Sequence, residues 1–128
     1  TIKGVGGHAA FPHNAVDPIL VGSALVMALQ SIVSRNVPPL QTGIISLGAF
    51  LAGDAPNVIP GSAELRLSVR AMQPEIRDLL ERRIHDMLRE QFPGLVYLIV
   101  GGASAEGDWR EHLEASSIWH LQNTVKNV

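Results

Sequence analysis

The segment from Ser62 to Ala71 alternates strictly between apolar and polar side chains. Its apolar members are Ala63, Leu65, Leu67, Val69 and Ala71, and its polar members are Ser62, Glu64, Arg66, Ser68 and Arg70. A period of two is that of a β-strand, and a single polar face indicates an antiparallel sheet that is covered on one side only. The segment therefore predicts a layered fold in which other elements cover the apolar face of a sheet.

Two segments have the features of helices suited to form the covering layer. Asp17-Pro18 provides an N-cap and a first helical residue for a helix that extends to about Ser34. Pro74 begins a second helix, to about Gln91, with apolar residues at helical spacing and a charged opposite face. The first helix has no charged residue between Pro18 and Ser34, whereas an ordinary surface helix keeps a polar face. We therefore expect this helix to be covered on two sides, by the sheet and by another subunit or domain.

Three further segments predict strands, namely Thr1 to His8, Thr42 to Leu51 and Leu95 to Val100. The order is then β-α-β-β-α-β, the split-βαβ arrangement, for which the right-handed crossover rule leaves few topologies. The predicted fold class is α+β: a ferredoxin-like two-layer sandwich with two helices on one face of a four-stranded antiparallel sheet. We expect residues 1–100 to form this domain and residues 101–128 to be a tail of uncertain structure. Because Thr1 already lies in a predicted strand, we also expect the chain to be a segment of a longer protein.

Composition and charge argue against several classes of function. The chain has 128 residues, 46% hydrophobic and 17% charged, which is a globular balance for one domain. A formal net charge of -2 and only 5% aromatic residues argue against nucleic acid as a partner. The absence of cysteine excludes a disulfide scaffold. No uninterrupted apolar stretch reaches the ~18 residues of a membrane span, so we expect a cytoplasmic protein that does not enter a membrane.

The sequence contains no complete catalytic constellation. Its five histidines form no H-x-D pair, and no two glutamates are adjacent, so no convergent set of metal ligands is predicted. The chain has no cysteine and no G-x-S-x-G nucleophile elbow, and the glycines at 4, 6 and 7 lack the spacing of a dinucleotide fingerprint. The chain by itself is therefore predicted to hold no metal and to be inactive.

Four motifs, in order along the chain, resemble one known family. They are Gly4-Val5-Gly6-Gly7-His8-Ala9-Ala10-Phe11-Pro12-His13 followed by Asp17-Pro18-Ile19, then Ala28-Leu29-Gln30-Ser31-Ile32-Val33-Ser34-Arg35, Gly53-Asp54-Ala55-Pro56-Asn57-Val58-Ile59-Pro60 and Leu67-Ser68-Val69-Arg70. Together they cover roughly residues 1 to 92. They resemble the lid, or dimerisation, domain of M20 metallopeptidases and amidohydrolases, above all the branch of hippurate hydrolases and N-acyl-amino-acid amidohydrolases.

The resemblance implies what the whole protein does. In that family a separate catalytic domain binds two divalent metal ions, usually zinc, manganese or cobalt. Metal-bound water attacks an amide bond and a glutamate of the catalytic domain acts as the base. The expected substrate is an N-acyl amino acid, hippurate-like or similar. The expected partners are a second copy of the chain in a homodimer and the catalytic domain of the same parent chain.

The resemblance also implies roles for individual residues. His8 matches the lid histidine that reaches into the active site of the partner subunit and stabilises the oxyanion of the scissile carbonyl. Asn57 matches an asparagine that contacts substrate, and Arg70 matches an arginine suited to bind the substrate carboxylate through its guanidinium fork. For His13 a role in capping or orienting the loop stays open.

Topology predicts where these residues lie. In a split-βαβ sheet the first two strands run parallel, so His8 and Asn57 are expected at the same end of the sheet. Arg70 is expected at the far end of a strand that spans roughly 30 Å. An alternative is a stand-alone βαββαβ ligand-sensing regulatory module, which would also dimerise.

Overall fold

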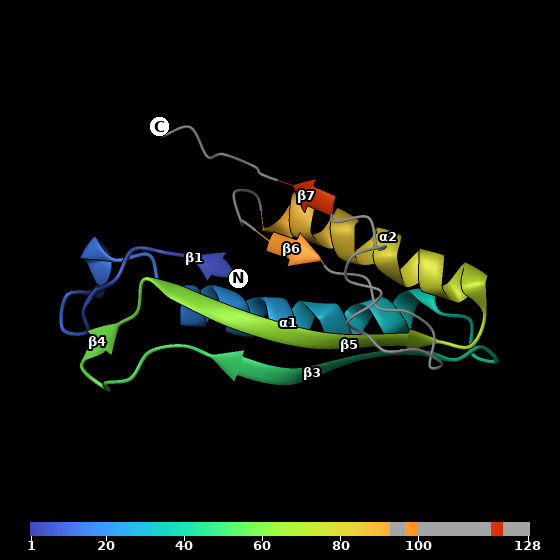
Figure 1. Ribbon diagram of the computed structural model, residues 1–128, viewed down its shortest axis with the longest axis horizontal. Coiled ribbons are helices and arrows are strands. Elements are labelled where there is room, and N and C mark those ends of the chain that lie inside the picture. The colour runs from blue at the N-terminus through green and yellow to red at the C-terminus, as the bar shows by residue number, and fades with distance from the viewer. Residues whose placement is uncertain (93–96, 100–118, 122–128) are drawn as a thin grey trace, which may run out of the picture.

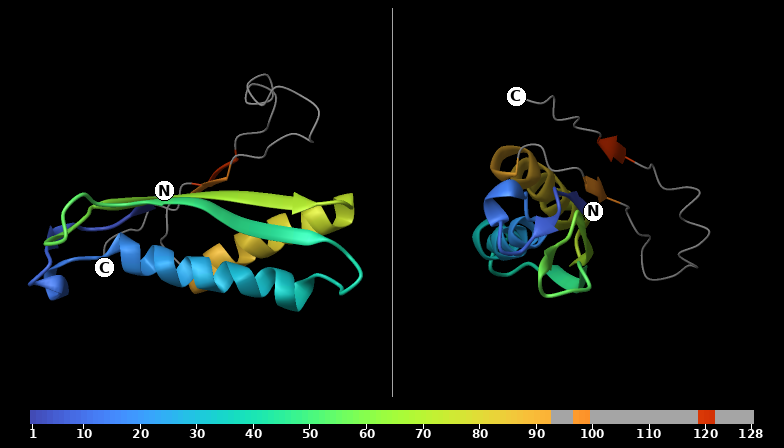
Figure 2. Two further views of the ribbon diagram at one scale, coloured as in Figure 1. Left: turned by 90° about the horizontal axis from the view of Figure 1, so that it is seen from below. Right: turned by 90° about the vertical axis from the view of Figure 1, so that its left-hand side faces the viewer.

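The chain folds into a sheet layer and a helix layer (Figures 1 and 2). The computed structural model describes residues 1–92, 97–99 and 119–121. The elements in chain order are β1 (Ile2–Lys3), β2 (Gly7–His8), the 3-10 helix η1 (Pro12–Asn14), α1 (Pro18–Asn36), β3 (Gly43–Leu51), β4 (Val58–Ile59), β5 (Ser62–Ala71), α2 (Pro74–Gln91), β6 (Tyr97–Ile99) and β7 (Trp119–Leu121). In the left view of Figure 2 both helices lie on one side of β3 and β5. The predicted α+β class, with two helices and antiparallel strands, is confirmed.

The central strand of the main sheet is β5. It pairs antiparallel with β1 on one side and with β3 on the other, so the strand order is β1-β5-β3. The register sets Ile45 opposite Val69, and it shifts between Leu47 and Ala49, where β3 contains an irregularity. Since β1 and β3 both run antiparallel to β5, they run parallel to each other, as the split-βαβ arrangement predicts.

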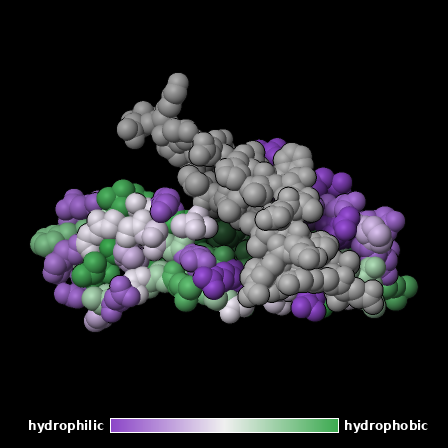
Figure 3. Space-filling view, in the orientation of Figure 1, coloured by the Kyte–Doolittle hydropathy of each residue, from purple (hydrophilic) through white to green (hydrophobic). Residues whose placement is uncertain are grey.

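Both helices begin where the sequence predicts. The carboxylate of Asp17 accepts hydrogen bonds from the backbone N–H groups of Ile19 at 2.8 Å and Leu20 at 3.4 Å, which is the geometry of an N-cap. The second helix starts at Pro74, with Glu75 in its first turn. Figure 3 shows hydrophilic side chains gathered over the end of the molecule where α2 lies, as its charged face predicts.

The hydrophobic core lies between the helices and the sheet. Its largest fully buried side chains are Leu29, Ile32, Leu80 and Pro18. Burial of each such aliphatic side chain contributes about 1.5–3 kcal/mol relative to exposure, so this layer is a main source of stability. The first helix approaches the sheet closely at Gly22, where an added Cβ would lie 2.6 Å from the ring of Phe50. A side chain at this position would therefore have to displace the ring of Phe50.

The expected fourth strand of the main sheet has a different partner. A strand was predicted from Leu95 to Val100, and β6 lies within that range. Its backbone pairs antiparallel with β7, a segment for which no strand was predicted. Within residues 1–92, 97–99 and 119–121 the main sheet therefore has three strands, and the four-stranded sheet stays a prediction. Residues 101–118 and 122–128 of the predicted tail lie outside the described part of the chain.

One side of α1 is apolar, uncharged and turned away from the core. Leu20 and Met27, seven residues apart and so on one helical face, are 70% and 74% exposed. The neighbouring Ser23 and Ser31 are exposed and uncharged, and their hydroxyls donate to carbonyl oxygens of the helix itself. This side of α1 therefore exposes apolar side chains and carries no charge.

By length and composition alone, α1 is also apolar enough to cross a membrane. Its residues Pro18, Gly22, Leu25, Leu29 and Ile32 are buried within the domain. The helix contacts α2, β1, β3 and β5. A core helix of a globular domain passes the same test, so this finding is a weak indication of a membrane span.

Candidate functional site

Two short strands beyond the end of the main sheet bring distant segments together. The strand β2 pairs antiparallel with β4, which sets His8 opposite Val58, and this end lies at the left of Figure 1. Directly after β2, the N–H of Ala9 donates to the carbonyl oxygen of Asn57 at 3.0 Å. Asn57 is exposed in a turn that Val58 closes by donating to the carbonyl of Ala55 at 3.3 Å. The structure thus places His8 and Asn57 side by side, at one end of the molecule as predicted.

The strands β1 and β2 belong to different sheets, β1 pairing with β5 and β2 with β4. Two residues explain why the pairing is interrupted between them. Pro60 has no backbone N–H and cannot donate to a neighbouring strand. Opposite it, Gly6 lies so close to β4 that an added Cβ would be 2.8 Å from the carbonyl oxygen of Ile59. The single strand predicted over residues 1–8 was therefore wrong in detail, because the structure divides it into β1 and β2.

His8 ends β2 with an exposed imidazole that is held by two contacts. Its Nδ1 accepts a hydrogen bond from the backbone N–H of Ala10 at 3.0 Å. Its ring meets the ring of Phe11 edge to face, with centroids 5.7 Å apart and an interplanar angle of 63°. A neutral imidazole whose Nδ1 is an acceptor carries its proton on Nε2. The geometry therefore leaves Nε2–H as the hydrogen-bond donor of His8, with no acceptor among the described residues.

The loop after His8 is closed by backbone hydrogen bonds and by a second histidine. The carbonyl of His8 accepts from the N–H of Phe11 at 2.9 Å, and the carbonyl of Pro12 accepts from Ala15 at 3.1 Å. The ring of His13 contacts Phe11 at 6.2 Å with an interplanar angle of 77°. His13 thus contacts the ring that contacts His8, which fits a role in orienting the loop. No role was predicted for Phe11, although its position between the two histidines was a signal.

Arg70 lies near the other end of β5, on the face that the helices leave open. Its Nε donates to the hydroxyl of Ser68 at 3.3 Å. On the same face Arg66 donates to the carboxylate of Glu64 at 2.7 Å. This hydrogen bond and the positive charge of Arg66 lower the pKa of the Glu64 carboxyl. Within the described ranges a carboxylate balances Arg66, whereas none forms an ion pair with Arg70.

The structure does not bring Arg70 to the His8 end. Arg70 is the ninth residue of β5, and Ser62 begins the strand next to the β2–β4 end. Eight steps at about 3.3 Å correspond to about 26 Å. A small dipeptide-sized substrate extends only about 10 Å. One small substrate therefore cannot contact His8 and Arg70 of the same copy of the domain.

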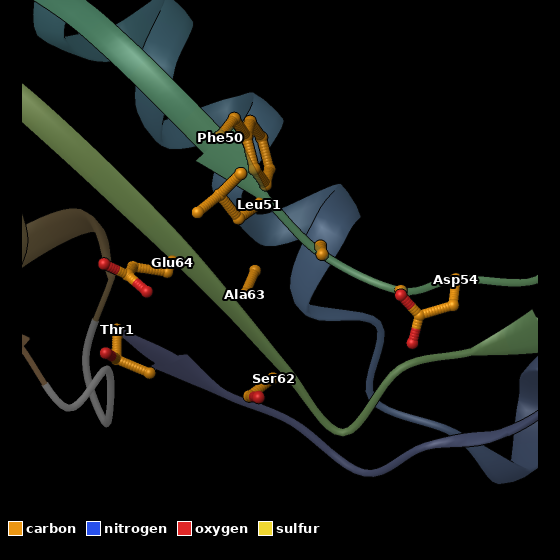
Figure 4. Close-up of a pocket in the computed structure, with 9 residues that line it drawn as sticks. Thr1, Phe50, Leu51, Asp54, Ser62, Ala63 and Glu64 are labelled. Atoms are coloured by element: carbon orange, nitrogen blue, oxygen red, sulfur yellow. The ribbon is translucent and has the colours of Figure 1, made fainter.

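A shallow hollow of about 580 Å³ lies elsewhere, between the end of β3 and the start of β5 (Figure 4). Phe50, Leu51, Asp54 and Glu64 are among its lining residues, and none of the three predicted site residues belongs to it. Among the residues that the structure describes, no three His, Asp or Glu side chains are grouped to hold a metal ion. This part of the chain therefore does not fit a dinuclear metal centre.

Comparisons with known proteins agree on one family. A family model described as "Peptidase dimerisation domain" (M20) matches residues 1–96. The hippurate hydrolase of Campylobacter jejuni is 49% identical over 88 residues, which are 69% of this chain and 23% of that protein. An N-acetyldiaminopimelate deacetylase of Lactiplantibacillus plantarum is 46% identical over 83 residues, 65% of this chain and 22% of that protein.

Two further matches extend the comparison. YhaA of Bacillus subtilis, described as an amidohydrolase, is 38% identical over an alignment that covers 100% of this chain and 33% of that protein. A crystal structure described as that of an aminohydrolase from methicillin-resistant Staphylococcus aureus matches with a TM-score of 0.68 and 34% identity, over 73% of this chain and 25% of that chain.

The chain belongs to the peptidase dimerisation domains of the M20 amidohydrolase family. The family description implies that the domain associates with itself. The chain spans 22% to 33% of the length of the three curated relatives named above.

Replacing Gly6 with alanine is expected to loosen the strand pair that carries His8. The new Cβ would meet backbone atoms of β4, which cannot rotate away, so the free energy of unfolding should fall by about 1–3 kcal/mol. Urea denaturation measures this loss, and faster hydrogen exchange at the Ala9 N–H should accompany it. Gly7→Ala is the matched control, because its Cβ would meet only Ala15 at 3.6 Å. Equal stability of the two variants would contradict the close approach at Gly6.

Proposed function

We propose that this chain is the lid-and-dimerisation domain of a metal-dependent amidohydrolase that cleaves the amide bond of N-acyl amino acids, hippurate-like or similar. The names of two relatives, a hippurate hydrolase and an N-acetyldiaminopimelate deacetylase, point to substrates of this kind. The observation that carries the proposal is the exposed Nε2–H donor of His8, fixed at the β2–β4 end of the domain.

His8 is proposed to donate Nε2–H to the oxygen of the scissile carbonyl, in the active site of the partner subunit. Negative charge develops on this oxygen as water adds to the carbonyl, so a donor fixed in advance stabilises the transition state more than the substrate. The contacts of His8 with Ala10 and Phe11 support this role, because they fix both the tautomer and the plane of the ring. Asn57, attached to the same loop through Ala9, is proposed to contact the substrate beside the carbonyl.

Arg70 is proposed to bind the carboxylate of the amino-acid part of the substrate, in the active site of its own subunit. A guanidinium recognises a carboxylate through two parallel N–H donors. Among the described residues the charge of Arg70 has no paired carboxylate, whereas Arg66 on the same face is paired with Glu64. The separation of about 26 Å along β5 supports a division of labour in which each active site receives His8 from one copy and Arg70 from the other.

The second copy is proposed to cover the uncharged side of α1. Leu20 and Met27 present the apolar surface for this contact. The helix then has the two coverings that its composition predicts, the sheet on one side and the partner's equivalent helix on the other. A symmetric dimer requires such a self-complementary surface.

The rest of the parent chain is proposed to supply the catalytic domain with two divalent ions, zinc, manganese or cobalt, and a glutamate base. The metal ions would provide activated water, and the part of the chain described here would contribute positioning and charge stabilisation. The domain alone is therefore proposed to be inactive, and the enzyme to act in the cytoplasm. The alternative of a ligand-sensing module gains no support from the hollow beside Glu64, which is shallow and open to solvent.

Substitution of His8 by alanine in the full-length enzyme is expected to lower kcat/KM by about 10²–10³, mainly through kcat, because the oxyanion loses a donor. Steady-state kinetics on an N-acyl amino acid, at equal metal content, measures the loss. His13→Ala is the control in the same loop and should lose much less. An unchanged kcat/KM in the His8 variant would refute the role assigned to His8.

Substitution of Arg70 by glutamine is expected to discriminate between substrates with and without a free carboxylate. Loss of charged hydrogen bonds should lower kcat/KM roughly tenfold or more for an N-acyl amino acid, and much less for its carboxamide analogue. The matched control is Arg66→Gln, on the same face of the same strand. Equal losses with both substrates, or equal effects of the two variants, would contradict carboxylate binding by Arg70.

Substitution of Met27 by arginine is expected to weaken the dimer by roughly tenfold or more in Kd, because it places a charge in an apolar contact. Sedimentation across a range of protein concentrations measures the dissociation constant. Met72→Arg provides the control, since Met72 is 81% exposed but lies outside α1. A dimer that is equally stable in both variants would place the interface elsewhere.

A further inference from the structure

Phe11 is an exposed aromatic residue that stabilises the fold little. Its side chain is 55% exposed, and it does not belong to the hydrophobic core, whereas Phe50 and Phe92 pack against that core. An exposed phenylalanine forgoes most of the stabilisation that burial of its ring would provide. Its place on the loop is nevertheless fixed, by the turn hydrogen bond to His8 and by ring contacts with His8 and His13.

Two apolar residues lie next to His8. The ring of Phe11 lies 5.7 Å from the imidazole, centroid to centroid. Val58 is the register partner of His8 in the β2–β4 pair, so their side chains point to the same side, and Val58 is 51% exposed. A polar side chain next to two half-exposed apolar side chains suits a site from which water is excluded when a substrate binds.

We propose that Phe11 is a specificity-determining residue that contacts the acyl group of the substrate and favours aromatic or large apolar acyl groups over acetyl. The inference rests on the proposed role of His8 as donor to the scissile carbonyl. A hydrogen bond of about 2.9 Å from Nε2 to the carbonyl oxygen places the first atoms of the acyl group within about 4–6 Å of the imidazole. Phe11 lies at that distance from the same ring, so an acyl group directed towards it meets an aromatic surface.

The size of the acyl group decides whether it reaches Phe11. A benzoyl ring attached to the carbonyl carbon can pack against Phe11 edge to face or offset, as aromatic pairs prefer. An acetyl group ends at one methyl and leaves most of the Phe11 ring uncovered. The contact therefore lowers the energy of the transition state for benzoyl substrates more than for acetyl substrates, which is selectivity in kcat/KM.

The test is a set of variants of the metal-loaded, full-length enzyme assayed on the benzoyl and acetyl derivatives of one amino acid. Phe11→Ala is expected to lower the ratio of kcat/KM for benzoyl over acetyl roughly tenfold. Phe11→Leu, which keeps apolar bulk without a ring, should give an intermediate ratio. Val16→Ala is the control. Val16 is 54% exposed, like Phe11, but its backbone bridge is with Val5 and not with His8.

A fall in the benzoyl-to-acetyl ratio in both Phe11 variants, with the ratio of Val16→Ala unchanged, supports the proposal. An equal loss on both substrates in Phe11→Ala overturns it, because Phe11 would then only support the ring of His8. His8→Ala in the same assay separates this failure from failure of the proposed function. Loss of the His8 donor should affect both substrates alike, and a His8 variant with full activity would remove the basis of both proposals.

Discussion

Packing of α1 and α2 against β5 is the constraint on which the rest of the structure depends. Ala63 at the start of this strand is buried and Leu65 is packed against the core, whereas Leu67 and Val69 stay 42% and 40% exposed. This strand contacts β1, β3 and both helices, so every layer of the domain meets there. Its period of two leaves the opposite face polar, and that open face carries Glu64, Arg66, Ser68 and Arg70. One strand therefore contacts the core on one face and carries the polar residues, Arg70 among them, on the other. The same strand, extended backwards through Pro60 into β4, positions the His8 loop.

The two ends of β5 carry different functional groups because the backbone pairing is interrupted at one end and regular at the other. At the beginning, Pro60 and the close approach of Gly6 interrupt the ladder, and the chain re-pairs as β2 and β4. This second pairing fixes the His8 loop, and Ala10 then fixes the imidazole tautomer. At the other end the ladder with β3 is regular, and Arg70 is held at a constant distance of about 26 Å from the start of the strand. In the proposed account, this separation is the reason that each active site takes His8 from one copy of the domain and Arg70 from the other.

Much of this arrangement is predictable from local sequence patterns. The alternation of residues 62–71 predicts β5 with its observed bounds, and the Asp17-Pro18 and Pro74 signals predict the starts of both helices. The closeness of His8 and Asn57 follows from topology. The division of the first strand was not predictable, because it depends on how closely Gly6 approaches β4, which is a tertiary contact. The pairing of β6 with β7 and the ring contact of Phe11 with His8 likewise depend on segments meeting in space.

The central claim, that His8 acts in the partner's active site, is tested most directly by mixing two inactive full-length variants. One carries His8→Ala, and the other carries an intact His8 but a catalytic-domain glutamate base replaced by glutamine. After subunit exchange, half of the dimers should be mixed, and each mixed dimer should contain one complete site, which gives about a quarter of wild-type activity. Recovery to that level is the result that the account predicts. A mixture that stays as inactive as its two components, with exchange verified by mass spectrometry, would show that His8 acts within its own subunit.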